Sequence, residues 1–167
     1  MSTGAESFIS MVKHPFKFRM FMLFKLPSAF FSGIRVRYVD GEKSLVTIPY
    51  KWFSRNPFGS TYFACLSMAA EMSTGILAMG HSYGLNPPIS MLVVKMEATF
   101  SKKAKGITSF TCDEGKRIAL AIKETLSSGK STSVTVRAVG NNEENEGVAD
   151  FYFTWSFKVK EQKAVKK

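Results

Sequence analysis

The spacing of apolar side chains follows two different periods along the chain, and each period predicts a different kind of element. In GIRVRYVD (33–40) and SLVTIPY (44–50), every second residue is apolar, which is typical of half-buried strands. The intervening GEK is a turn sequence. These segments predict a hairpin with one face against a core.

The most apolar stretch, RNPFGSTYFACLSMAAEMSTGILAMG from Arg55 to Gly80, contains one charged side chain after its first residue, Glu71. No proline interrupts it from Ser60 onward, so it predicts a helix of about 30 Å with Ser60 or Thr61 as the N-cap. Its apolar residues surround the axis, so the helix should be enclosed on nearly every side. A buried carboxylate without a partner costs free energy, which makes Glu71 a candidate for function.

Four further strands are expected after that helix, with one short helix between the two pairs. The strands cover 89–104, 106–112, 131–140 and 148–160, and the helix covers 113–130. The first half of the 89–104 strand is apolar on both faces, which indicates burial in a subunit contact as well as in the core. The last strand carries an aromatic stripe, which we interpret as core packing in preference to a base-stacking platform. The stripe comprises Ala149, Phe151, Phe153, Trp155, Phe157 and Val159.

Two short helices, 5–12 and 16–24, are expected before the hairpin, separated by Pro15 and ended by Pro27. The order of elements predicts an α+β fold in which a curled antiparallel sheet wraps around a long central helix. We expect an N-terminal helical extension over residues 1–31, the sheet and its helix over 32–160, and a basic tail over 161–167. The strands are long enough to continue the sheet across a dimer.

The composition adds a strong basic excess, a formal net charge of +10 over 167 residues. That charge suits nucleic acid, anionic lipid or phosphate-bearing small molecules, although a solvated lysine-rich C-terminus accounts for much of it. The run FKFRMFMLFKLPSAFF carries too many charges to span a membrane, but it could lie on a surface. The first residues lack the features of a signal peptide, and Cys65 and Cys112 have no zinc-site spacing. We therefore expect a cytoplasmic protein with reduced thiols.

The loop and helix around Glu71 resemble those of hotdog-fold thioesterases, especially the phenylacetyl-CoA-thioesterase-like branch and its uncharacterised acyl-thioesterase-like relatives. That branch carries an Asn, a Gly three residues on and an acidic residue fifteen after the Asn, and Asn56, Gly59 and Glu71 have this spacing. The order of strands and helices matches the hotdog fold over roughly residues 33–159. The His-Gly-Gly step of the branch is replaced here by Tyr62, Phe63 and Ala64.

The resemblance implies an acyl-CoA thioesterase-like protein that hydrolyses or binds an acyl thioester at a dimer interface, with no cofactor and no metal. Glu71 would act as general base on a water or as nucleophile, with its pKa raised by apolar surroundings. Asn56 could position the water or the substrate. The other substrate-binding candidates lie at the loop and the helix entrance, where backbone N–H groups could hold an oxyanion. They are Gly59, Ser60, Tyr62, Phe63 and Ala64.

Other interpretations remain open on the sequence. Asn56 could serve only its own turn, and Glu71 could be satisfied by a cap or an arginine inside a dimer contact. The bulkier helix entrance could make the protein a non-catalytic acyl- or lipid-binding hotdog module. Lys102, Lys103 and Lys105 could hold the phosphates of coenzyme A. We expect a homodimer or a dimer of dimers and no nucleic-acid partner, and we leave a peripheral membrane contact open.

Overall fold

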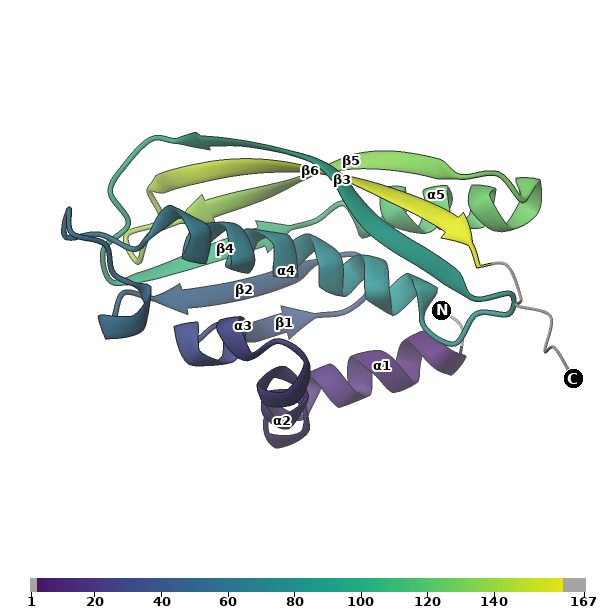
Figure 1. Ribbon diagram of the computed structural model, residues 1–167, viewed down its shortest axis with the longest axis horizontal. Coiled ribbons are helices and arrows are strands. Elements are labelled where there is room, and N and C mark those ends of the chain that lie inside the picture. The colour runs from purple at the N-terminus through teal and green to yellow at the C-terminus, as the bar shows by residue number, and fades with distance from the viewer. Residues whose placement is uncertain (1–2, 161–167) are drawn as a thin grey trace, which may run out of the picture.

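The computed structural model describes residues 3–160, in which a six-stranded antiparallel sheet curls around one long helix (Figure 1). The strand order is β1-β2-β4-β5-β6-β3, so the two halves of the chain meet where β2 pairs with β4. The helical elements are α1 (Thr3–Lys13), α2 (Pro15–Lys25), α3 (Pro27–Ser32), η1 (Trp52–Ser54), α4 (Phe63–Ser82) and α5 (Gly115–Ser128). The strands are β1 (Arg35–Val39), β2 (Ser44–Pro49), β3 (Ile89–Phe100), β4 (Ile107–Cys112), β5 (Thr132–Asn141) and β6 (Gly147–Val159).

The long helix α4 lies on the concave face of the sheet, as the apolar stretch predicts. It contacts β2, β4, β5 and β6, and α5 packs beside it against β5. By length and composition α4 could cross a bilayer, but 67% of its apolar window is buried inside the fold, as in the core helix of a globular domain. Burial on several sides explains why polar residues are scarce along it.

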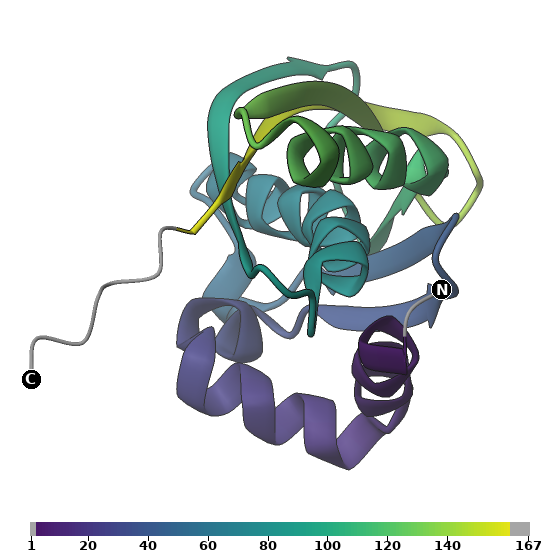
Figure 2. The same ribbon diagram turned by 90° about the vertical axis from the view of Figure 1, so that its right-hand side faces the viewer.

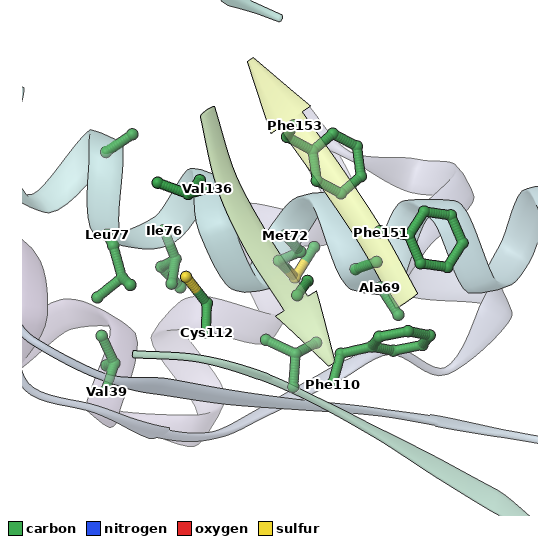
Figure 3. Packing of buried hydrophobic residues seen from close by; sticks show 14 of the residues in the cluster. Val39, Ala69, Met72, Ile76, Leu77, Phe110, Cys112, Val136, Phe151 and Phe153 are labelled. Carbon is green, nitrogen blue, oxygen red and sulfur yellow. The ribbon is translucent and has the colours of Figure 1, made fainter. Parts of the chain in front are cut away.

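The aromatic stripe of β6 is buried in the hydrophobic core, which confirms its interpretation as core packing. Phe151 and Phe153 are buried, whereas the alternate position Tyr152 is 42% exposed. Figure 3 shows Phe110 of β4 beside Phe151, with ring centroids 5.6 Å apart, and both strands facing α4. The alternating pattern thus places one face of the strand in the core.

Strand β3 lies at one edge of the sheet and pairs only with β6 among the described strands. It ends at Phe100, four residues before the predicted end, and its register shifts between Val93 and Lys95. Leu92 and Val94 are 64% and 53% exposed. A bulge at this point reorients the side chains, and it leaves apolar residues on an uncovered edge. The subunit contact expected there stays a prediction.

The N-terminal helices close the open side of the curled sheet (Figure 2). Helix α1 contacts α4 and β1, and α3 contacts α4 and η1. The sequence pattern predicts two helices here, but a third, α3, begins at Pro27 because proline fits the first turn of a helix. The division at residues 31 and 32 stays a prediction, and the basic tail at 161–167 lies outside the described residues.

Candidate functional site

The loop before α4 is organised by the side chain of Asn56. Its Oδ1 accepts the backbone N–H of Phe58 at 3.0 Å and of Ser60 at 3.3 Å, and its Nδ2 donates to Ser60 Oγ at 3.2 Å. Gly59 has a φ of +72°, a conformation that other residues rarely adopt. Asn56 therefore uses its amide inside its own loop, which favours the turn role over direct contact with a substrate.

The predicted N-cap at Ser60 or Thr61 is wrong, because α4 begins at Phe63 and Tyr62 is the N-cap residue. The Ser60 hydroxyl is engaged by Asn56, and the Thr61 backbone N–H donates to Ala104 O at 2.8 Å. The side chain of Tyr62 makes no capping hydrogen bond. Among the described residues, the backbone N–H groups of Phe63 and Ala64 meet no acceptor, as the first turn of a helix allows.

An open pocket of about 570 Å³ lies between the Asn56 loop, the start of α4 and the segment after β3. Tyr62 and Phe63 are 45% and 54% exposed beside it, with ring centroids 4.9 Å apart, and the ring of Phe100 lies 6.5 Å from that of Phe63. Lys102 and Lys103 also line it; Lys102 pairs with Glu146, and Lys103 donates to the carbonyl of Phe58. Lys105 lines a neighbouring surface hollow instead.

Glu71 lies elsewhere, on the wall of a smaller apolar cavity of about 110 Å³. The cavity lies between α4, the N-terminal helices and β3, which contributes Met91. Within residues 3–160 the Glu71 carboxylate has no hydrogen bond and no ion pair, and burial raises its pKa above the ordinary value. The N-terminal contribution to the cavity consists of Phe8, Phe18, Phe21 and Leu26.

Gly75 makes room for this carboxylate, a role that the sequence reasoning missed. A Cβ at Gly75 would lie 3.0 Å from Glu71 Oε1 and 3.2 Å from Trp155 Cζ2. The two residues are four apart on α4, so they occupy the same face one turn from each other. That spacing is the signal by which Gly75 could have been found.

One chain therefore does not bring the predicted site residues together. Asn56, Ser60, Tyr62 and Phe63 line the open pocket, Gly59 belongs to the same loop, and Ala64 is half-buried behind them. Glu71 is eight residues farther along α4 than Phe63, which is about 12 Å along the helix axis.

The histidines make local hydrogen bonds, and the cysteines are buried in the core. His81 Nε2 lies 2.7 Å from Gly41 O, and His14 caps α2 by accepting the Lys17 N–H. Cys65 and Cys112 are buried free thiols, and burial raises the pKa of Cys112 to about 11. Across residues 3–160, no three histidine, cysteine or acidic side chains gather as a metal site would require.

A family model described as "Domain of unknown function (DUF4442)" matches residues 16–157, from α2 to the end of β6. The chain belongs to the DUF4442 family. No curated protein matches this DUF4442 chain.

Solved structures resemble the DUF4442 chain over nearly its whole length. The Pseudomonas aeruginosa protein PA5026, titled a protein of unknown function and "Probable Thioesterase", superposes with a TM-score of 0.74 at 19% identity, over 96% of this chain and 99% of its own. The thioesterase HI1161 of Haemophilus influenzae gives 0.62 at 12% identity, over 90% and 94%. The E. coli PaaI protein from the phenylacetic acid degradation operon gives 0.60 at 13% identity, over 87% and 94%. At these identities the likeness shows the fold, and it confirms the predicted α+β hotdog fold.

Proposed function

We propose that this protein is an acyl-CoA thioesterase that hydrolyses its substrate at a site shared by two subunits of a homodimer. The thioesterase-like hotdog neighbours support the general class. The observation that carries the proposal is Glu71, an unpaired, partly buried carboxylate on the wall of an apolar cavity. A carboxylate in that setting costs stability, and a raised pKa suits a general base.

In the proposed reaction, Glu71 takes a proton from a water molecule whose oxygen attacks the thioester carbon. The carbonyl oxygen becomes an oxyanion, which the free N–H groups of Phe63 and Ala64 stabilise with help from the dipole of α4. When the tetrahedral intermediate collapses, the C–S bond breaks and the proton passes to the leaving thiolate. These chain groups supply a base and an oxyanion hole without a cofactor.

The separation of these groups is the reason for proposing a dimer. The attacking water and the oxyanion belong to one carbon atom, so the base and the donors must both lie within a few ångströms of it. About 10–12 Å of helix separates Glu71 from the two donors in one chain. A two-fold partner that brings its own α4 entrance to Glu71 would complete the site, and the reciprocal site would form by symmetry.

The edge strand β3 is the surface we assign to this dimer. Its outer backbone groups pair with no described strand, and Leu92, Val94 and Phe100 are exposed there. Antiparallel pairing with the partner's copy would extend the sheet and cover this apolar edge. A dimer of dimers could form from further contacts.

The cavity at Glu71 suggests a small acyl group. Its volume of about 110 Å³ is smaller than the ~150 Å³ engineered cavity that accommodates benzene, so a short acyl chain fits the scale better than an aryl group. The phosphates of coenzyme A would lie toward the open pocket at the helix entrance, near Lys102 and Lys103. Lys105 stands close by in sequence and could add a third charge.

A second candidate function is a non-catalytic acyl- or lipid-binding module. The observation that favours it is the pair Tyr62 and Phe63, whose rings stand beside the pocket at the helix entrance. In that case native mass spectrometry of the purified protein would find an acyl ligand, and acyl-CoA esters would bind without turnover.

The test measures the hydrolysis of a panel of acyl-CoA esters, from short straight-chain esters to phenylacetyl-CoA, by detecting the free thiol that is released. We expect Glu71→Gln to lower kcat/KM by a hundredfold or more, the range for removal of a general base. The matched control Glu124→Gln removes an exposed carboxylate from α5 and should keep full activity. Equal activity of the two variants would remove Glu71 from the mechanism.

A further inference from the structure

A second pocket, of about 260 Å³, lies at the opposite edge of the sheet from β3, between α1, α2 and the edge strand β1. Figure 2 shows α2 running below this edge. The pocket wall combines cationic and apolar side chains. Four cations line it, Lys13, Arg19, Arg35 and Arg37, and no acidic side chain of residues 3–160 does.

The arginines enter the pocket from two elements. Arg19 comes from α2, where its guanidinium lies 3.9 Å over the ring of Phe30 and 3.5 Å from Ile34 O. Arg35 and Arg37 come from β1, whose register shifts between Val36 and Tyr38. A bulge of this kind re-aims side chains at a sheet edge, and both arginines line the pocket. Arg37 Nε also donates to Thr47 Oγ1 of β2 at 3.0 Å.

In the described part of the chain none of these cations takes part in an ion pair, and the side chain of Arg35 makes no hydrogen bond. Burial, and after it the charge of Arg35, lowers the pKa of Arg19, so the two guanidiniums repel each other. Lys13 acts electrostatically on Asp40 and helps to lower the pKa of its carboxyl group, but the oxygens of Asp40 already accept the Tyr38 hydroxyl and three turn N–H groups.

A cluster of like charges at a concave surface costs stability unless an anion joins it. Guanidinium groups bind phosphate through paired N–H donors, and several of them together favour a doubly charged group over a single carboxylate. The apolar side of the wall, Val12, Phe18 and Met22, would contact the carbon skeleton that bears the phosphate.

We propose that the pocket between α2 and β1 binds the phosphate group of a phosphate ester, through Arg19, Arg35 and Arg37. The source of that phosphate is either a soluble phosphate ester or the headgroup of an anionic lipid. This site goes beyond the proposed thioesterase function, because it uses neither Glu71 nor the entrance of α4. Phe18 lines both this pocket and the cavity at Glu71, so the two are neighbours.

The first experiment is a titration of the full-length protein with inorganic pyrophosphate at constant ionic strength. The arginine Nε–Hε signals in NMR spectra report the binding. We expect saturable shifts for Arg19, Arg35 and Arg37, and none for Arg117, which pairs with Glu114. Shifts that fail to saturate, or that appear equally at Arg117, would show a general ion atmosphere and overturn the proposal.

The decisive variant is Arg35→Gln, because Arg35 is exposed and, within the described residues, its side chain makes no hydrogen bond or ion pair, while its backbone pairing with β2 is unaffected by the substitution. It should weaken pyrophosphate binding by about tenfold or more. Arg35→Lys keeps the charge but loses the paired N–H donors of the guanidinium, so its affinity should lie between those of the wild type and Arg35→Gln. The matched control Lys123→Gln removes one exposed charge from α5 and should leave binding unchanged. Equal affinity in Arg35→Gln and Lys123→Gln overturns the proposal.

Two further arms separate the sources of the phosphate. Saturable binding of glycerol 1-phosphate that requires Arg35 identifies a soluble ester, and retention on phosphatidylglycerol vesicles that requires Arg35 identifies a lipid headgroup. Phosphatidylcholine vesicles serve as the control. The melting temperature of Arg35→Gln without ligand should match or exceed that of the wild type, since the substitution removes repulsion from Arg19; a fall would assign Arg35 a structural role and contradict the proposal.

Discussion

Replacing Glu71 by glutamine should stabilise the fold at neutral pH. Burial raises the folded-state pKa of Glu71 above its ordinary value of 4.5, and no described partner compensates the charge. As pH rises from the unfolded-state pKa through the folded-state pKa, the unfolded chain releases this proton first, so the free energy of unfolding falls. Below both pKa values the carboxyl group is neutral in both states and the cost vanishes.

The size of the effect follows from the same comparison. Each pKa unit by which folding weakens the acid lowers the free energy of unfolding at high pH by about 1.4 kcal/mol. A buried polar group without a partner costs about 1–3 kcal/mol. The glutamine amide keeps part of that cost, so we expect a gain of about 1–2 kcal/mol at pH 7. For a chain of this length about 2–4 °C of melting temperature accompanies each kcal/mol.

The assay is urea unfolding of the wild type, Glu71→Gln and Glu124→Gln at pH 4 and pH 7, at one fixed protomer concentration because a dimer melts in a concentration-dependent way. The difference between the wild type and Glu71→Gln should be present at pH 7 and disappear at pH 4. A loss of stability at pH 7 would refute the reasoning, since it would mean that the carboxylate is held by a partner.

Three further predictions concern packing, assembly and thiol reactivity. Gly75→Ala places a methyl carbon 3.0 Å from Glu71 Oε1, whereas at Gly80 the nearest contact is an ordinary 3.7 Å. Because alanine has the higher helix propensity, Gly80→Ala should raise the free energy of unfolding in urea by up to about 1 kcal/mol. Gly75→Ala should raise it less and should lose acyl-CoA hydrolysis. Equal gains in stability with full activity would contradict this packing. Leu92→Lys should convert the dimer to monomers in sedimentation and abolish hydrolysis, and an active monomer would disprove the shared site. The pKa of Cys112 at about 11 leaves roughly 0.1% thiolate at pH 8, so iodoacetamide should modify it slowly until urea unfolds the chain, and rapid native labelling would contradict its burial.

The parts of the fold that sequence reasoning predicted are those set by local periodicity. Alternation in β6 placed Phe151 and Phe153 in the core, where both are buried. The uninterrupted apolar run predicted α4, and the helix predicted over 113–130 is α5, which ends at Ser128 because Gly129 follows with a φ of +67°. Each of these follows from a repeat of two or 3.6 residues or from one glycine, without knowledge of distant contacts.

The parts that escaped prediction depend on contacts between distant segments. The start of α4 moved to Phe63 because Asn56 engages Ser60 and a segment after β3 takes the Thr61 N–H. The β3 bulge near Val94 lies in a run that is apolar at every position, so alternation could not locate it. The cavity around Glu71 is built partly by Phe8 and Phe21 of the N-terminal helices, and no local pattern links these helices to α4.

The central claim, that Glu71 of one subunit serves the helix entrance of the other, is tested most directly by mixed dimers. Ala64→Pro removes a backbone N–H at the first turn of α4, where proline is tolerated because that N–H has no acceptor. Each homodimer, Glu71→Gln or Ala64→Pro, should be inactive, provided that its unfolding curve shows a folded protein. Heterodimers purified through two different tags contain one site with an intact Glu71 and an intact entrance. We predict that they hydrolyse acyl-CoA at about half the wild-type rate; heterodimers as inactive as the two homodimers would contradict a site shared between subunits.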